Sequence, residues 1–184
     1  MTMRALAAFE TGEGAAARVR AEAPDKVRPG LSWLLCGLSG RAMTVEPTDS
    51  EAADVPTRPV LTSTHLLLPD KTAGEGAAPS VAARDHAAVA HAAAHLLYSP
   101  AAQPVATLKP MGLAVVSAIE DARVERVLAA SYPGVRRWFR PFVPSLPDPA
   151  DLSFAALMRR LCRLLMDATP VSYTHLTLPT NREV

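Results

Sequence analysis

The chain has 184 residues, of which 49% are hydrophobic and 20% are charged, and its formal net charge is +1. This length fits one domain with a substantial core, and the charge gives no electrostatic support for binding to nucleic acid or to an acidic membrane. The only cysteines, Cys36 and Cys162, are far apart and have no metal-ligand spacing around them. A disulfide scaffold is therefore excluded, and a reducing compartment is favoured.

Neither a signal peptide nor a membrane-spanning segment is expected from the sequence. Glu10 comes too early for the apolar region of a signal peptide. No uninterrupted apolar run approaches the roughly 20 residues needed to span a bilayer. We therefore expect a cytoplasmic protein without membrane insertion.

The first part of the chain predicts a short helical start and then a small β element. Residues 1–24 are compatible with one or two short helices, and the apolar cluster 31–36 is too short to be assigned from its period. Segments 41–46 and 60–68 have the β-branched content of strands. We expect them to pair as an antiparallel hairpin across a long polar connection, with His65 in a structural role.

Two long helices are predicted next. Ser80 is placed to cap a helix that ends near Tyr98, and a second helix begins near Pro110 and ends near Ser131. The first half of this second helix, residues 112–119, is apolar on nearly every side. We therefore expect it to be the most buried element of the fold.

The C-terminal part predicts two further helices. A short helix at residues 135–142 is expected to turn Trp138 and Phe142 toward the core. A last helix, residues 152–168, carries a leucine stripe and has Asp151 as its expected cap. The arginines of the short helix could bind a phosphate or an acidic partner, but we interpret them as solvated. The predicted fold class is mainly α with a small antiparallel β element.

Residues 171–184 resemble the translation of a transposon-end sequencing adaptor. The match is close over VSYTHLTLPT, residues 171–180, and a segment of that origin is excluded from fold reasoning. On this interpretation residues 1–170 are a truncated helical N-terminal region, His175 has no functional meaning, and the natural protein continues past Pro170. A natural threonine-rich tail is the competing interpretation.

The predicted functional residues lie on the two long helices. His91 and His95 are four residues apart and so share one face of the first helix. This spacing supplies two ligands to zinc, and a third ligand comes from another element. Glu120 lies on an apolar stripe of the second helix, where a charge needs a partner, and an antiparallel helix would return it to the histidines. The sequence thus predicts a metal site of His91, His95 and Glu120, with Asp121 as the neighbouring candidate.

The same residues allow an interpretation without metal. The two imidazoles can hydrogen-bond to Glu120, to Asp121 or to backbone carbonyls and so satisfy one another in the core. Zinc peptidases carry a glutamate directly after the first histidine as the general base, whereas this chain has Ala92 there. We therefore expect little or no peptidase activity, whichever interpretation holds.

Four segments carry a resemblance to a known family. They are AHAAAHLLYS at residues 90–99, LKP at 108–110, IEDARVE at 119–125 and YPG at 132–134. They resemble the N-terminal region of von Willebrand A-domain proteins, most of all the nitric oxide reductase activation protein (NorD-like) family, which is related to the cobaltochelatase large accessory subunit. The similarity covers roughly residues 60–143, and the EDARVE segment is its most specific part.

The resemblance implies a helical region followed by a C-terminal A domain with a metal-ion-dependent adhesion site. It also implies a partner AAA+ ATPase of the MoxR type, which acts with the protein to activate or metallate a target enzyme such as nitric oxide reductase. Related proteins carry an intact His-Glu-x-x-His, so His91, His95 and Glu120 would match a degenerate version. No Asp-x-Ser-x-Ser loop of the A domain is present, which agrees with a chain cut short at Pro170.

Two functions are expected on these grounds. The first is a non-catalytic accessory region that binds the ATPase and the target metalloenzyme. The alternative is a degenerate zincin-like metal-binding domain, in which the two long helices hold zinc with little or no peptidase activity.

Overall fold

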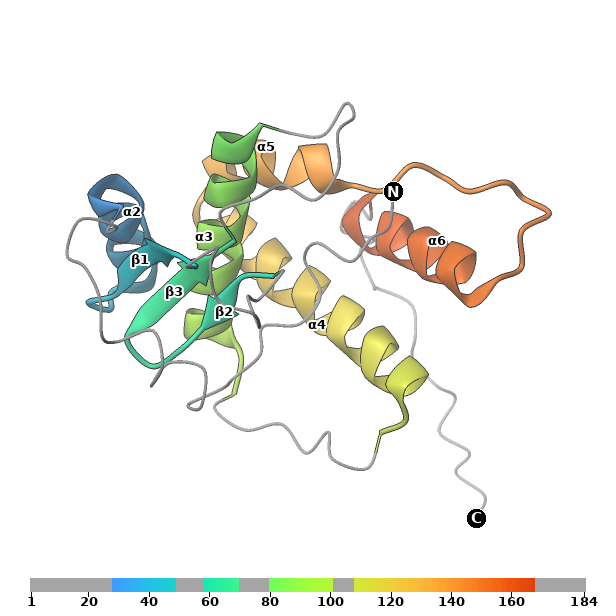
Figure 1. The fold of residues 1–184 in the computed structure, drawn as a ribbon. Coiled ribbons are helices and arrows are strands. Elements are labelled where there is room, and N and C mark those ends of the chain that lie inside the picture. The colour runs from blue at the N-terminus through green and yellow to red at the C-terminus, as the bar shows by residue number, and fades with distance from the viewer. Residues whose placement is uncertain (1–27, 49–57, 70–79, 101–107, 168–184) are drawn as a thin grey trace, which may run out of the picture.

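The computed structural model describes residues 28–48, 58–69, 80–100 and 108–167 (Figure 1). In these parts the chain is mainly helical with a small sheet, so the predicted fold class is confirmed. The helices are α2 (Pro29–Ser39), α3 (Val81–Tyr98), α4 (Pro110–Ser131), α5 (Arg136–Phe139) and α6 (Phe154–Asp167), with 3₁₀ turns at Pro133–Val135 and Arg140–Phe142. The expected N-terminal helices and the adaptor-like tail lie outside the described residues.

The apolar cluster 31–36 is part of helix α2. Pro29 occupies its first turn, where a missing N–H costs nothing, and Gly40 ends it in the left-handed conformation with φ +67°. The Gly40 N–H donates to the carbonyl of Cys36 at 2.8 Å. Proline thus marks the start of this helix and glycine marks its end, although the spacing of its apolar residues did not identify it as a helix.

Two glycines of this segment should respond in opposite directions to alanine. Gly40→Ala is expected to lower the free energy of unfolding by about 1 kcal/mol or more, because a Cβ is strained at positive φ. Gly37→Ala is expected to raise it by about 0.5–1 kcal/mol, because Gly37 is exposed inside the helix and a Cβ there meets no atom within 4 Å. Urea unfolding of both variants tests this pair. A change of the same sign in the free energy of unfolding of both variants would contradict the assignment of Gly40 as the end of the helix.

The sheet differs from the expected antiparallel hairpin. Strand β3 (His65–Leu68) is central, β1 (Thr44–Pro47) pairs with it in parallel, and β2 (Val60–Leu61) pairs with it antiparallel. The segment 60–68 therefore folds back on itself. Thr62 makes this turn, since its Oγ1 accepts the His65 N–H at 2.9 Å. The predicted pairing of 41–46 with 60–68 is thus wrong in direction, because a turn inside the second segment reverses the strand that meets β1.

Helix α3 lies at the centre of the described structure. Helix α2 and strand β3 contact it, as do helices α4 and α5 (Figure 1). Its alanines have side chains small enough to let neighbouring helices approach closely. The buried residues on α3 are Asp85, Ala87, Ala88, Val89, Ala90, His91, Ala92, Ala93 and Ala94.

The expectation that residues 112–119 would be the most buried element is wrong. Leu113, Val116 and Ile119 are exposed, and Ala118 is the one buried residue of this segment. The other buried residues of α4 lie in its second half, at Val124, Glu125, Leu128 and Ala129. The reason is that α3 packs along the second half of α4, where His91 and His95 meet acidic residues of that helix. No helix within the described ranges is long and apolar enough to cross a membrane.

Of the two C-terminal helices, the short one has the core-facing aromatic side chains that were expected, and the last one differs from expectation in its cap. Phe139 is the buried aromatic residue of the short helix, while Trp138 and Phe142 are half-buried against the core. Ser153 caps α6 by accepting the N–H of Ala156, and Asp151 instead accepts the N–H of Ser153. The sequence thus indicated both elements and missed only the capping residue of α6, which is Ser153 and not Asp151.

A second buried charged residue, Asp85, connects helix α3 to the segment that precedes α2. Asp85 on α3 is 3% exposed and pairs with Arg28, which precedes α2, and with its neighbour Arg84. Arg84 also donates to the carbonyl of Pro69, which follows β3, at 2.8 Å. This network is structural, because each charge in it is paired with another on the same chain.

Candidate metal centre

The candidate site lies where α3 and α4 cross. His91 pairs with Glu125 and His95 pairs with Asp121, so the two helices run antiparallel here. Each helix contributes two side chains one turn apart, which places both pairs on facing surfaces. The antiparallel arrangement expected from the sequence is confirmed at this point.

His91 is the most buried member of the site. It is 1% exposed, its Nδ1 lies 2.7 Å from Oε1 of Glu125, and its Nε2 lies 3.8 Å from Oδ1 of Asp121. Burial acts to lower the pKa of His91. The hydrogen bond to Glu125 and the charges of Glu125 and Asp121 outweigh burial, so the pKa is raised above 6.5.

His95 is bound by a hydroxyl on one side and a carboxylate on the other. Its Nε2 lies 3.2 Å from Oδ1 of Asp121, and its Nδ1 lies 2.8 Å from Oγ of Ser99. The His95 ring meets that of His91 edge-on, with centroids 4.6 Å apart. Asp121 is therefore the carboxylate of α4 that faces both imidazoles.

Glu120, the predicted third ligand, has different partners. Its carboxylate accepts hydrogen bonds from Ser99 at 2.7 Å and from Arg123 at 2.7 Å. The hydrogen bond from Arg123 and that from Ser99 lower its pKa to about 2, against the opposing effect of burial. Ser99 thus lies between Glu120 and His95, and the structure brings Asp121 to the histidines in its place.

The sequence contains a spacing pattern that favours Asp121 over Glu120 as the partner of the two histidines. Asp121 and Glu125 repeat at the same four-residue spacing as His91 and His95. In an antiparallel helix pair, two such spacings match each other residue for residue. Glu120 is rotated by about 100° from Asp121 around the helix, so only one of the two can face α3.

Three of these side chains could hold a metal ion. His91, His95 and Asp121 each offer a ligand atom, and these atoms all lie within 4.8 Å of one another. A zinc–nitrogen bond of about 2.0–2.1 Å places the corners of a tetrahedron about 3.3 Å apart. The two Nε2–Oδ1 distances, 3.2 and 3.8 Å, bracket that separation. These two distances fit a tetrahedral centre, and three protein ligands would leave its fourth position open.

The hydrogen-bond donors determine which ring nitrogens face Asp121. Ser99 has one hydroxyl hydrogen, which it donates to Glu120, so its oxygen accepts from Nδ1–H of His95. Glu125 is an acceptor for Nδ1–H of His91. Both rings consequently turn Nε2 toward Asp121. Metal-bound histidines characteristically donate their other N–H to such an oxygen, which sets the tautomer.

Ser99, His95 and Asp121 also have the residue types of a nucleophilic triad. In such a triad the histidine accepts the proton of the serine hydroxyl. Here that proton points to Glu120, and the His95 nitrogen nearest Ser99 is a donor. The arrangement therefore orients His95 and does not activate Ser99.

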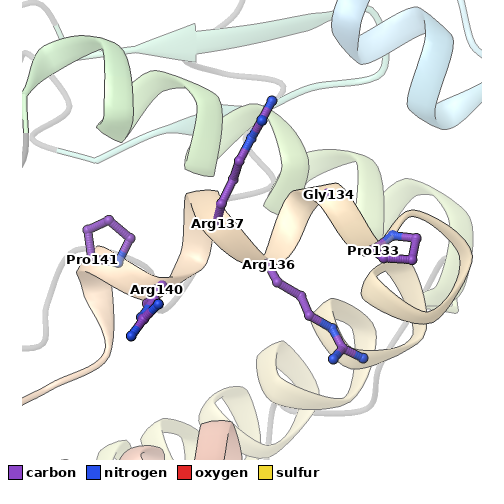
Figure 2. Close-up of a pocket in the computed structure, with 6 residues that line it drawn as sticks. All are labelled: Pro133, Gly134, Arg136, Arg137, Arg140 and Pro141. Carbon is purple, nitrogen blue, oxygen red and sulfur yellow. The ribbon is translucent and has the colours of Figure 1, made fainter.

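A shallow cavity on the short helix offers no competing site. It is lined by Pro133, Gly134, Arg136, Arg137, Arg140 and Pro141. Figure 2 shows that the three arginine side chains point in different directions, so they do not converge on one anion. Arg137 instead lies over the ring of Trp138, with its guanidinium carbon 5.5 Å from the ring centroid.

No protein-family model matches this chain, and neither a curated protein nor a solved structure is significantly similar to it. The resemblance to von Willebrand A-domain proteins is therefore untested. Geometry at His91, His95 and Asp121 is the structural feature that points to a function.

Proposed function

We propose that this chain binds a zinc ion between α3 and α4, at His91, His95 and Asp121, without catalytic turnover. The observation that supports the proposal is the orientation of the two imidazoles. Each has an oxygen acceptor at Nδ1 and directs Nε2 toward Asp121. Partners of this kind orient metal ligands and raise their basicity.

The donor set favours zinc over the common hard cations. Imidazole nitrogens suit zinc and other late transition metals, whereas magnesium and calcium take oxygen ligands. Two imidazoles and one carboxylate give three protein ligands for a tetrahedral ion. When bound, the ion would neutralise the charge of Asp121 inside a largely buried site.

The absence of turnover follows from the carboxylates near the site. Ala92 replaces the glutamate that serves as general base in zinc peptidases and is fully buried. The pKa of Glu120 is about 2, which makes it a weak base at neutral pH. Glu125 is already the hydrogen-bond acceptor of His91. The proposed ion therefore has a binding or structural role.

Zinc binding by the purified chain tests the proposal directly. We expect about one equivalent of bound zinc for the wild-type chain and for His86→Ala, and less than about one-tenth equivalent for His91→Ala and Asp121→Ala. His86 is the matched control because it lies on α3 but outside the metal-binding group. Ser99→Ala should weaken binding about 10- to 100-fold, because it removes the partner of His95. Wild-type protein with as little zinc as His91→Ala would refute the metal site.

We further propose that the protein is a cytoplasmic accessory component that works with a MoxR-type AAA+ ATPase on a target metalloenzyme. Two observations favour this role. The IEDARVE segment, which carries the family resemblance, supplies Asp121 and Glu125 to the histidine pair. The first half of α4 exposes apolar side chains of a kind that docks partners, namely Met111, Leu113, Val116 and Ile119.

Co-purification of the protein with a MoxR-type ATPase in the presence of ATP tests this role. Val116→Glu should reduce recovery of the ATPase, because it places a charge in the apolar surface of α4. Leu164→Glu is the matched control, since Leu164 is 69% exposed and lies on α6. The proposal fails if no ATPase is recovered with the wild-type protein.

A further inference from the structure

A chain of hydrogen bonds connects His95 with the protein surface. Nδ1 of His95 lies 2.8 Å from Oγ of Ser99, and the Ser99 hydroxyl donates to Oε1 of Glu120 at 2.7 Å. Arg123 then donates to both oxygens of Glu120, with each distance 2.7 Å. The Arg123 side chain is exposed. Neither Glu120 nor Arg123 is a proposed zinc ligand, yet both are joined to one through Ser99.

Arg123 determines the direction of every hydrogen bond in this chain. A guanidinium has donors only, and a carboxylate that receives two of them in a bidentate pair acts as an acceptor. The hydrogen between Ser99 and Glu120 must therefore come from Ser99. The Ser99 hydroxyl has one hydrogen, so toward His95 it can only accept.

Arg123 also holds the backbone that carries Ser99. Its guanidinium donates to the carbonyl of Tyr98 at 2.8 Å. Tyr98 is the last residue of α3, and Ser99 is the C-cap of that helix. The same side chain thus fixes the carboxylate that orients the Ser99 hydroxyl and the peptide unit from which the hydroxyl projects.

The two imidazoles differ in how their tautomers are set. Nδ1 of His91 faces the Glu125 carboxylate directly, at 2.7 Å. Nδ1 of His95 faces a hydroxyl, which can accept or donate. If Ser99 donated, the ring proton of neutral His95 would lie on Nε2, which is 3.2 Å from Asp121. That proton would occupy the lone pair that zinc needs, so His95 depends on the group beyond its own partner.

We infer that Glu120 and Arg123 are positioning residues of the zinc site, which fix the Ser99 hydroxyl as an acceptor and so keep Nε2 of His95 available to the metal. This inference rests on the proposed function. Without Glu120, the Ser99 hydroxyl can turn its hydrogen to Nδ1, and Nε2–H of His95 can then donate to Asp121. Zinc binding would require the ring proton to leave Nε2, which lowers the affinity.

Zinc titration of the whole chain by calorimetry tests the inference through a double-mutant cycle. Glu120→Ala should weaken zinc binding about 10-fold in the wild-type background. In the Ser99→Ala background the same change should have no effect beyond about 2-fold, because Glu120 acts through the hydroxyl. Asp167→Ala is the matched control. It removes another exposed arginine–carboxylate pair, Arg163–Asp167 on α6, and should leave the affinity unchanged.

The tautomer of His95 gives a second readout that requires no metal. Nitrogen-15 NMR of the imidazole rings in chelator-treated protein shows which nitrogen carries the proton. We expect a proton on Nδ1 of His95 in the wild-type chain and in Asp167→Ala. In Glu120→Ala we expect that proton on Nε2 and none on Nδ1. A loss of packing at Glu120 would not move a proton between the two nitrogens.

The outcomes separate the two proposals. If the wild-type chain binds zinc and Glu120→Ala binds it equally well, the positioning role is refuted and the three-ligand site stands. An equal loss with and without Ser99 would refute that role as well, as would a proton on Nδ1 of His95 in Glu120→Ala. No zinc binding by the wild-type chain would refute the metal site and, with it, this inference.

Discussion

Replacing Glu125 with alanine is expected to lower the free energy of unfolding by about 3 kcal/mol or more. His91 is 1% exposed, and its Nδ1 lies 2.7 Å from the Glu125 carboxylate. The variant leaves a buried imidazole without the acceptor and the charge that raise its pKa. Urea unfolding of metal-free protein measures the loss.

Glu120→Ala is the matched control for this experiment. It removes the same residue type from the same helix, but Glu120 pairs with an Arg123 side chain that is 46% exposed. Exposed ion pairs contribute about 0–1 kcal/mol, so the expected loss is below about 1 kcal/mol. Equal losses in the two variants would mean that the buried pair does not hold α3 and α4 together.

Zinc is expected to reverse the way in which stability depends on pH. In the metal-free protein the pKa of His91 is raised above 6.5 in the folded state. The stabilisation from its charged form is therefore complete below pH 6.5 and is lost as the pH rises through the folded pKa. Zinc requires neutral imidazoles, so its contribution instead grows with pH. At a zinc concentration of 100 times Kd, this contribution is about 2.7 kcal/mol.

Thermal unfolding at about pH 6 and about pH 8 measures how stability changes with pH. A sample with chelator gives the slope for metal-free protein, and a sample with zinc gives the slope for the zinc-bound protein. Glu120 does not interfere, because its pKa of about 2 keeps it ionised throughout this range. His86→Asn should keep both slopes, while His91→Gln should lose both. Slopes of the same sign with and without zinc would contradict the assignment of His91 as a ligand.

Local signals in the sequence were enough to predict the long helices. Ser80 caps α3 by accepting the N–H of Ala83 at 3.2 Å, and Pro110 begins α4, as expected from their residue types. Both signals act within a few residues, so no knowledge of the rest of the fold is needed. The four-residue spacing of His91 and His95 is local in the same sense.

The burial of α4 is a feature that local signals in the sequence did not predict. Residues 112–119 are apolar, yet Ile119 is 47% exposed, because α3 packs along the other half of the helix. An apolar segment can be buried at low cost, but it becomes buried only where another element of the fold packs against it. The same limit applies to the sheet. The turn at Thr62 reverses the chain before β3, and this reversal determines how β3 pairs with β1 and β2.

The sequence by itself determined the two long helices, the shared face of His91 and His95, and the matching four-residue spacing of Asp121 and Glu125 on the next helix. The tertiary structure decided which carboxylate uses that match, since Asp121 meets both imidazoles while Glu120 meets Ser99 and Arg123. Neighbouring residues on a helix point about 100° apart, so the rotation of α4 against α3 selects one carboxylate and turns the other away. That rotation is set by packing between distant segments, which the order of residues does not display.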